Sequence, residues 1–389
     1  MNNNDDKKEL IEGRYISKSS RPEIACLIDW NKDADSIKSL VTGLYFNNDI
    51  NPIGTAKLKI DDDFYFIKEI IELPIISEVM PGSLKSVNNE NIIISTKTND
   101  VEIRRLFHLN GEEIKLSDLI VRHNLFAGKK FSTLSNRELN SLKYYEDIIN
   151  KKEDYWVKEL LNIELPELPY KKENIPTFNR YFTQSMSIPY QLKDSINLSG
   201  LSLKFTEYFS SLFILFFGRL TTSDYFTLGG FNCELKKELE SAFNLFENEV
   251  PINIQLNLNN KLSNELIKVS SLIKIYQEAK TFYKDLLYRY PELRSKKVIK
   301  YPLAIAIVND IKDFDEIDGS DLTLIFTKNN LCYWHYCSSI YSEENIKILQ
   351  KQFRIFLDEA LVDPYKKLYK YNINQEEEVK SFAEIVNEE

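Results

Sequence analysis

The histidines are the first side chains to consider for chemistry, because imidazole is the group that most often moves protons near neutral pH. The chain has three, His108, His123 and His335. His335 lies between Trp334 and Tyr336 in a run that predicts a strand, which favours a packed or edge position over a general base. His108 follows an Arg-Leu-Phe segment and His123 lies in a polar connector, so structural or solvated roles are expected for both.

Other residue types that carry chemistry do not form a recognised site. The cysteines have no paired spacing typical of zinc and are expected to be buried thiols: Cys26, Cys233, Cys332 and Cys337. The acidic runs 61–63 and 376–378 are typical of solvated turns or tails. The sequence contains no G-x-S-x-G, P-loop, G-x-G-x-x-G or H-E-x-x-H word. We therefore assign no catalytic residue, no cofactor and no metal ligand from the sequence.

Composition indicates a globular protein of two domains. The chain has 389 residues, of which 43% are hydrophobic and 12% aromatic, with only 11 glycines and 12 prolines. Its formal charge is −9, the wrong sign for neutralising phosphates, so nucleic acid is not expected as a partner. The N-terminus has no apolar signal segment, and the longest apolar run, 209–217, is too short to span a membrane. A cytoplasmic location without a membrane partner is therefore expected.

The first third of the chain predicts a small barrel. One helix is expected over 33–44, where Ile37, Leu40, Val41 and Leu44 follow a helical spacing. Short strands are expected over 56–60, 64–72, 82–87, 91–96 and 100–109, separated by Asp-, Asn- and Pro-Gly-rich turns. Several short strands with a single early helix are typical of a barrel.

The amino-acid sequence of this part, over residues 15–125, resembles the C-terminal OB-like domain of the methionyl-tRNA formyltransferase family. Its most specific pieces are Asp29-Trp30, the Pro81-Gly82-Ser83 turn and the turn at Gly111. The resemblance implies that the family's catalytic residues would lie in a preceding domain, which this sequence does not contain. In formyltransferases that act on tRNA, this domain holds the nucleic acid with basic residues.

Basic residues are outnumbered in this part of the chain. Residues 1–125 carry 16 lysines and arginines against 21 aspartates and glutamates, a formal balance of −5. Arg104, Arg105, Lys57 and Lys59 could form a small basic patch, but solvated strand faces are the favoured interpretation. The sequence therefore does not predict a phosphate-binding surface.

The rest of the chain predicts layers of helices and strands. Ser135 is expected to cap a connecting helix, and 201–220 is the strongest helix, because aromatic residues recur in it every three or four positions. Strands are expected over 181–188, 224–230, 250–256, 303–308, 322–327 and 331–337, and helices over 262–276, 278–290 and 346–361. Alternation of this kind is typical of a layered lobe.

This order of elements resembles the C-terminal lobe of a nonribosomal peptide synthetase condensation domain, which has a chloramphenicol-acetyltransferase-like fold. The resemblance covers residues 142–378 and is carried by Tyr155-Trp156, Leu165-Pro166 and Asp363-Pro364. It departs at 231–249, where the family's glycine- and arginine-bearing loop is replaced. The family's reactive histidine belongs to an H-H-x-x-x-D-G word in the other lobe, and the sequence contains no such word.

These features together predict an α+β protein with two domains. The expected parts are a disordered terminus at 1–12, an OB-like barrel at 13–125, a helical connector at 126–150, a condensation-like lobe at 151–370 and an acidic tail or linker at 371–389. The favoured function is a non-catalytic structural or docking module of a nonribosomal peptide synthetase-type system. Its expected partners are an adenylation domain or other synthetase domains, in cis or in trans, and a carrier protein. The alternative is an acyl- or aminoacyl-transferase that uses a partner lobe or an unrecognised residue such as His335.

Overall fold

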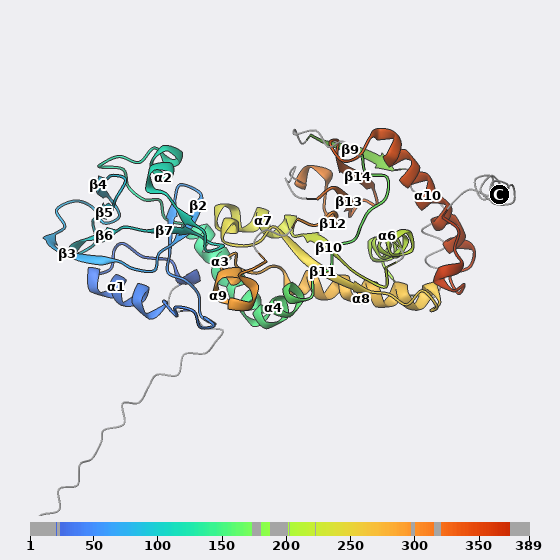
Figure 1. Ribbon diagram of the computed structural model, residues 1–389, viewed down its shortest axis with the longest axis horizontal. Coiled ribbons are helices and arrows are strands. Elements are labelled where there is room, and N and C mark those ends of the chain that lie inside the picture. Colours follow the sequence, from blue (N-terminus) through green and yellow to red (C-terminus); the bar gives the residue numbers. More distant parts are fainter. Residues whose placement is uncertain are drawn as a thin grey trace, which may run out of the picture. The chain divides into compact units, whose positions relative to one another are not determined.

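The chain divides into two compact units, each with its own core. The computed structural model describes residues 21, 24–172, 180–186, 201, 203–221, 223–296, 300–314 and 320–373. The first unit comprises Met1–Ile60, Tyr65–Phe107 and Glu113–Phe131, and the second comprises Asp61–Phe64, His108–Glu112 and Ser132–Glu389. Strands and helices occur in both units, which confirms the expected α+β class (Figure 1).

The N-terminal part contains two four-stranded sheets and two helices. The first sheet has the order β1 (Lys57–Ile60), β2 (Asp63–Phe66), β7 (Leu106–His108), β8 (Glu113–Ile114). The second has the order β3 (Ile71–Ile76), β6 (Asn99–Ile103), β5 (Ile92–Ile94), β4 (Leu84–Val87). Helices α1 (Ala34–Gly43) and α2 (Leu116–His123) contribute Ile37, Val41 and Leu119 to the buried core of this unit.

The barrel expected from the sequence is not closed, because its described strands are hydrogen-bonded as two separate sheets. Pro74 lies within β3 and has no N–H to donate, and the β3–β6 register shifts between Glu72 and Ile76. The expected strands 64–72 and 100–109 are each divided in two, the second of them at Arg104 and Arg105. Each division allows the chain to leave one sheet and enter the other.

Trp30 anchors the entering segment in the core of the first unit. The side chain is 4% exposed and its ring centroid lies 6.1 Å from that of Phe131. Gly82 has a φ of +82°, and a Cβ at this position would lie 3.3 Å from Cδ1 of Trp30. The turn therefore requires glycine both for its left-handed backbone and for the close approach of the indole.

The second unit is built on a six-stranded mixed sheet. Its strand order is β11 (Glu249–Gln255), β10 (Tyr225–Phe231), β12 (Leu303–Val308), β13 (Leu322–Thr327), β14 (Cys332–Cys337), β9 (Tyr181–Met186). Strands β10, β12 and β13 are parallel to one another, and the remaining pairs are antiparallel. The strands expected from alternation of apolar residues are therefore confirmed in this unit, with boundaries that differ by one residue at most where the structure describes them; positions 187 and 188 of the first expected strand lie outside the described residues.

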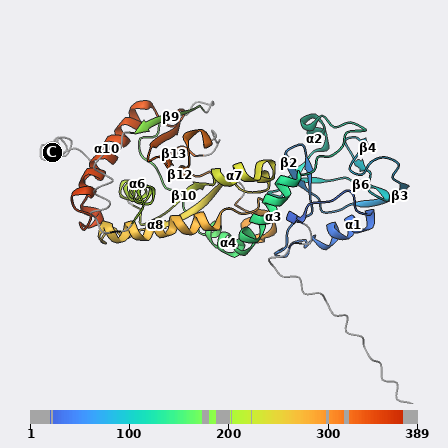
Figure 2. The same ribbon diagram turned by 180° about the vertical axis from the view of Figure 1, so that it is seen from behind.

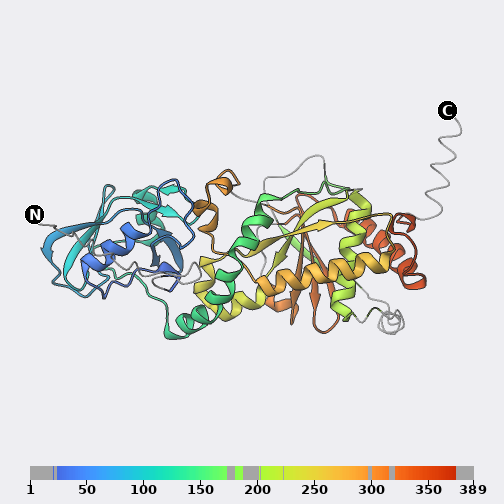
Figure 3. The ribbon, with the colours of Figure 1, turned by 90° about the horizontal axis from the view of Figure 1, so that it is seen from below.

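Three long helices pack on one face of this sheet. Helix α6 (Phe205–Thr221) lies between the sheet and α10 (Glu343–Val362) in both views (Figures 1 and 2). The ring of Phe213 meets Trp334 of β14 edge-on at 5.4 Å and Phe353 of α10 at 5.7 Å. Figure 3 shows α8 (Leu262–Ala279) as a long helix alongside the strands. No helix within the described ranges is both long and apolar enough to cross a membrane.

Helices α3 (Asn136–Lys151) and α4 (Glu153–Leu161) join the second unit through buried polar contacts. A capping box at Ser135 and Glu138 begins α3, as expected from the sequence. The helix predicted over 278–290 is wrong over most of its length, because only α9 (Leu286–Arg289) forms. The segment before α9 instead makes a β-bridge between Phe246 and Tyr283.

Candidate functional site

His335, the residue on which a transferase mechanism would depend, is buried in the six-stranded sheet on the face opposite that of Trp334, because neighbouring residues of a strand point to opposite faces. It is opposite Thr183 in the β14–β9 ladder, and a hydrogen bond of 2.8 Å joins its Nδ1 to the Thr183 hydroxyl. The ring of Tyr181 stacks on the imidazole at 5.1 Å with an interplanar angle of 4°, and Phe314 meets its edge at 5.1 Å. The imidazole is thus held on three sides, and only 2% of the residue is exposed.

Burial determines the electrostatics of His335. It lowers the pKa of the imidazole to about 4, so the ring is neutral at pH 7. Its Nε2 atom is buried and has no hydrogen-bond partner among the described residues. A neutral, enclosed imidazole of this kind can accept or donate one hydrogen bond, but a general base needs contact with a substrate proton.

The other two histidines do not join His335. His123 ends α2 in the first unit, where its Nε2 lies 2.7 Å from the buried hydroxyl of Tyr65. His108 ends β7 and is half-buried. Of the two roles expected for His123, structural or solvated, the structural one is correct, since the residue is 6% exposed.

The cysteines occupy core positions, as expected. All four lie in the described part of the chain, are buried and take no part in a disulfide. Within the described ranges, histidine, cysteine, aspartate and glutamate side chains do not form a group of three or more that could hold a metal ion.

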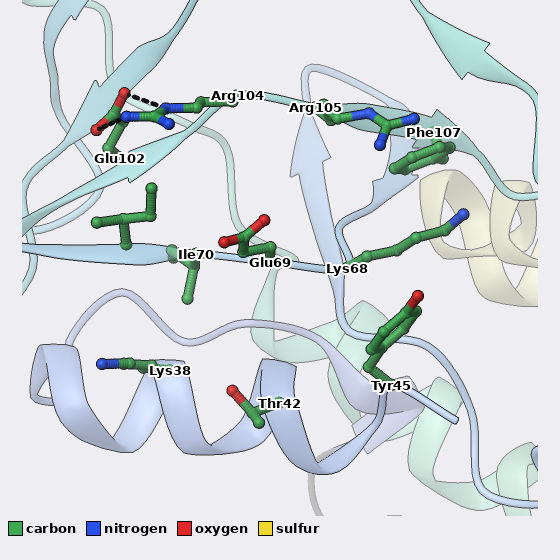
Figure 4. A pocket seen from close by; sticks show the side chains of 11 residues that line it. Lys38, Thr42, Tyr45, Lys68, Glu69, Ile70, Glu102, Arg104, Arg105 and Phe107 are labelled. Atoms are coloured by element: carbon green, nitrogen blue, oxygen red, sulfur yellow. Dashed lines mark hydrogen bonds and ion pairs between the residues drawn. The ribbon is translucent and has the colours of Figure 1, made fainter. Parts of the chain in front are cut away.

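A pocket of about 470 Å³ lies in the first unit, beside α1 (Figure 4). Helix α1 contributes Lys38 and Thr42, and the segment that leads into β3 contributes Lys68 and Glu69. The third side is the segment between β6 and β7. The charged residues that line the pocket are Lys38, Lys68, Arg104, Arg105, Glu69 and Glu102. Four cationic side chains thus face two carboxylates.

Two of these cations are fixed by carboxylates. The Nε of Arg104 donates to Glu102 at 2.8 Å, and this hydrogen bond lowers the pKa of Glu102. The Nε of Arg105 donates to Glu113 at 2.7 Å, and the pair is completed by a second contact through Nη2. Each guanidinium is held by both oxygens of a carboxylate, which fixes its orientation.

An aromatic cluster forms one end of the pocket. Phe107 stacks on Phe66 with centroids 5.2 Å apart, and both rings are buried. The Lys68 Nζ lies 3.9 Å from the centroid of the Phe107 ring, and the guanidinium carbon of Arg105 lies 5.3 Å from it. Tyr45 lines the same pocket and is 48% exposed. Lys68 and Arg105 thus both lie close to the ring of Phe107.

The basic patch considered in the sequence is only half present in this pocket. Arg104 and Arg105 line it, but Lys57 and Lys59 are buried and do not. The Lys57 Nζ donates to the backbone carbonyls of Ala25 at 3.2 Å and Thr55 at 3.1 Å. The interpretation of Lys57 and Lys59 as solvated strand residues is therefore wrong.

The second unit displays an exposed set of tyrosines and lysines where α10 ends. This tyrosine–lysine surface consists of Val362, Tyr365, Tyr369, Lys261, Lys367 and Lys370. Val362 is 87% exposed, Tyr365 56% and Tyr369 44%. The lysine Nζ atoms lie beside the rings, with Lys261 at 5.8 Å from Tyr365 and Lys370 at 5.9 Å from Tyr369.

This surface rests on a firmly anchored segment. Leu368 and Tyr371 are buried, and the ring of Tyr371 packs 5.4 Å from Phe356 of α10. The backbone runs beside the start of α8, where the Leu368 N–H donates to the Asn260 carbonyl at 2.9 Å. Leu368 and Tyr371, three residues apart at the 3-10 turn Leu368–Lys370, are thus buried, while Tyr365 and Tyr369 are held in place at the surface.

Neither the pocket nor the tyrosine–lysine surface was identified from the sequence. The pocket assembles side chains from three separate segments, which only the β3–β6 register, with Ile71 opposite Glu102, brings together. For the surface a signal was present: the spacing of tyrosines and lysines in 365–371 places two tyrosines out of step with the apolar residues.

Comparison with known proteins agrees with the resemblance of residues 15–125 to the formyltransferase family. The family model for the formyl transferase C-terminal domain matches residues 23–124. No curated protein sequence matches the chain. Among solved structures, the X-domain from teicoplanin biosynthesis is similar at 12% identity, with 72% of this chain and 73% of that chain covered and a TM-score of 0.46.

Two further solved structures are similar to part of the chain. The cyclization-docking bidomain of the synthetase EpoB from Sorangium cellulosum has 12% identity and a TM-score of 0.46, with 71% of this chain and 63% of that chain covered. The starter condensation domain of rhizomide synthetase RzmA has 13% identity and a TM-score of 0.39, with 66% and 61% covered. Residues 23–124 thus match the formyl transferase C-terminal domain family, and the chain has distant, partial likenesses among condensation-type domains of nonribosomal peptide synthetases.

Proposed function

We propose that the chain is a docking module of a nonribosomal peptide synthetase-type system, which binds a neighbouring synthetase domain and performs no reaction itself. The observation that carries the proposal is the tyrosine–lysine surface of the second unit. Tyrosine is enriched at the energetic centres of protein interfaces, because it buries a large ring at a small cost in side-chain entropy. Because Leu368 and Tyr371 are anchored in the core, little conformational freedom would be lost on binding.

The charge of this surface indicates the kind of partner. Lys261, Lys367 and Lys370 are exposed around the tyrosines, so the complementary face would be acidic at its rim and apolar at its centre. We assign this partner as an adenylation domain, because the end of the condensation-like lobe is where the sequence resemblance places the next synthetase domain. The contact can be made in cis or in trans, and a carrier protein is a further partner of the same assembly.

The environment of His335 supports a role without chemistry. The imidazole is enclosed by Tyr181, Thr183 and Phe314, and the sequence has no H-H-x-x-x-D-G word. A substrate would have to displace these neighbours before it could reach the ring. In this proposal, the second unit serves to pack against other domains and not to catalyse a reaction.

The experiment is a binding measurement with an adenylation domain of a nonribosomal peptide synthetase. Wild-type protein is expected to form a saturable complex, and the double variant Tyr365→Ala, Tyr369→Ala is expected to weaken it at least about tenfold, because two interface tyrosines are removed. Tyr144→Ala is the matched control, since Tyr144 is 68% exposed on α3. The proposal fails if no complex forms, or if the control weakens binding as much as the double variant does.

A second candidate function is acyl or aminoacyl transfer with a partner that supplies the missing lobe. One observation favours it: the buried Nε2 of His335 has no hydrogen-bond partner among the described residues. Transfer from an acyl-loaded carrier protein to an amine acceptor, measured with wild-type chain and with His335→Gln, separates the two functions. Docking alone predicts the same background rate for both proteins, whereas a transferase predicts turnover that the substitution abolishes.

A further inference from the structure

We infer that the pocket beside α1 binds a small organic anion, in which a carboxylate or phosphate group is joined to an aromatic or apolar body. The pocket lies wholly within the first unit, so this inference is independent of the docking surface on the second. Its volume of about 470 Å³ is within the usual range for small-molecule sites.

Charge is the first reason. The lining has four cationic side chains and two carboxylates, although the chain as a whole has a formal charge of −9. Lysines and arginines are therefore concentrated here against the overall balance of the protein. Lys38 lies exposed on α1 and makes no ion pair with any residue of the described ranges. Its ammonium group is available to a ligand.

The arrangement of the cations is the second reason. Lys68 and Arg105 lie against the same Phe107 ring, at 3.9 Å and 5.3 Å from its centroid. Arg105 is already oriented by Glu113, and this hydrogen bond raises the pKa of the guanidinium. Glu113 already balances part of this charge, because its pKa is lowered by the hydrogen bond from Arg105 and also by the charge of Lys68. The four cations of the lining still outnumber the three carboxylates Glu69, Glu102 and Glu113 by one, so a ligand with a single negative charge would complete the balance.

The apolar lining indicates the rest of the ligand. Ile70 and Ile71 line the pocket together with Tyr45, whose ring is half exposed and can cover a flat or aliphatic group. A free inorganic anion would leave these side chains uncovered. A molecule with one charged end and one apolar end satisfies both parts of the lining.

A polyanion fits this pocket less well than a small anion does. Glu69 and Glu102 lie among the cations, and the Arg105 guanidinium is paired with Glu113. These carboxylates interrupt the positive surface that consecutive phosphates of a nucleic acid would need. A single anionic group needs only one positive charge, which is the number by which the four cations exceed these three carboxylates.

Isothermal titration calorimetry of the full chain tests the inference with defined probes. Phenyl phosphate and benzoate are the anions, benzyl alcohol is the neutral counterpart, inorganic phosphate lacks the apolar body, and a ten-nucleotide single-stranded RNA represents the polyanion. We expect saturable binding of phenyl phosphate or benzoate, at least tenfold weaker binding of inorganic phosphate, and no binding of benzyl alcohol. Comparing the two aromatic anions tells phosphate from carboxylate as the preferred group.

Two variants connect the signal with the pocket. Lys68→Met keeps most of the packing of the half-buried side chain while removing its charge, and should weaken binding of the aromatic anion at least about tenfold. Lys115→Met removes an exposed lysine of the same unit outside the pocket and should leave binding unchanged. The inference is overturned if both variants bind alike, if benzyl alcohol binds as well as the anions, or if the RNA binds more tightly than phenyl phosphate.

Discussion

The buried ion network around Arg289 allows a quantitative prediction about what holds the second unit together. The Arg289 Nη1 donates to Glu153 at 2.7 Å and its Nε to Asp285 at 3.1 Å, while the Tyr290 hydroxyl donates to Glu153 at 3.0 Å. Arg289 and Asp285 are fully buried and Glu153 is 7% exposed. Burial alone would lower the pKa of Arg289, but the charges of Glu153 and Asp285 more than offset this and raise it.

Replacing Arg289 by methionine keeps much of the volume but leaves two carboxylates buried without a cation. Breaking a buried pair in this way costs about 3–5 kcal/mol of unfolding free energy. The matched control is Arg354→Met: Arg354 is 44% exposed and pairs with Asp358 one helical turn away at 2.9 Å. Loss of such a surface pair costs about 0.5 kcal/mol or less. The loss of unfolding free energy is therefore expected to be at least about six times larger for Arg289→Met than for Arg354→Met.

Urea unfolding followed by tryptophan fluorescence measures this difference, because Trp156 and Trp334 are both buried in the second unit. A triple variant, Arg289→Met with Glu153→Gln and Asp285→Asn, removes the uncompensated charge and should recover part of the loss. If Arg289→Met lowers the unfolding free energy by less than about 1 kcal/mol, the network does not hold the unit together and the reasoning is refuted.

Three further substitutions test local parts of the account. Glu138→Ala removes the acceptor that caps α3 and binds the Ser241 N–H at 3.1 Å, and should cost about 2 kcal/mol by urea unfolding, whereas Glu138→Gln should cost less. Burial raises the pKa of Glu249 to about 8, so its contribution to stability is present below the unfolded pKa and is lost as the pH rises towards 8. In thermal melts, Glu249→Gln should show a smaller decline in stability over this pH range than the wild type. An unchanged slope would contradict the prediction. Burial lowers the pKa of His335 to about 4, so stability should fall as the pH drops from 6.5 to 4, and His335→Gln should remove part of that fall if the imidazole is buried in its neutral form.

Much of the second unit could be predicted from the spacing of apolar residues. Helix α6 is lined by aromatic side chains that all contribute to one core, so its periodicity reflects its environment directly. The helix expected over 278–290 is wrong over 280–285, because α8 ends at Ala279, Lys280 has a φ of +62° and Tyr283 forms a bridge with Phe246. A tertiary contact of this kind has no local signal.

The pocket could not be predicted, because its members are far apart in the sequence. Lys38, Lys68 and Arg105 line one pocket only because β3 pairs with β6 and α1 packs against these strands. Lys57 was expected to be near Arg104 and exposed, and its burial depends on two backbone carbonyls that accept from its ammonium group. A sequence shows that a lysine is charged, but it does not show which buried oxygen atoms will accept hydrogen bonds from its ammonium group.

The most direct test of the proposed docking function is amide hydrogen exchange on this chain, measured with and without an adenylation domain of a nonribosomal peptide synthetase. Docking through the tyrosine–lysine surface predicts slower exchange in 258–263 and 362–371 when the partner is present, with little change around His335. Contradiction would come from unchanged exchange in both segments, or from protection confined to the strands that carry Thr183 and His335, which would place the partner at the histidine instead.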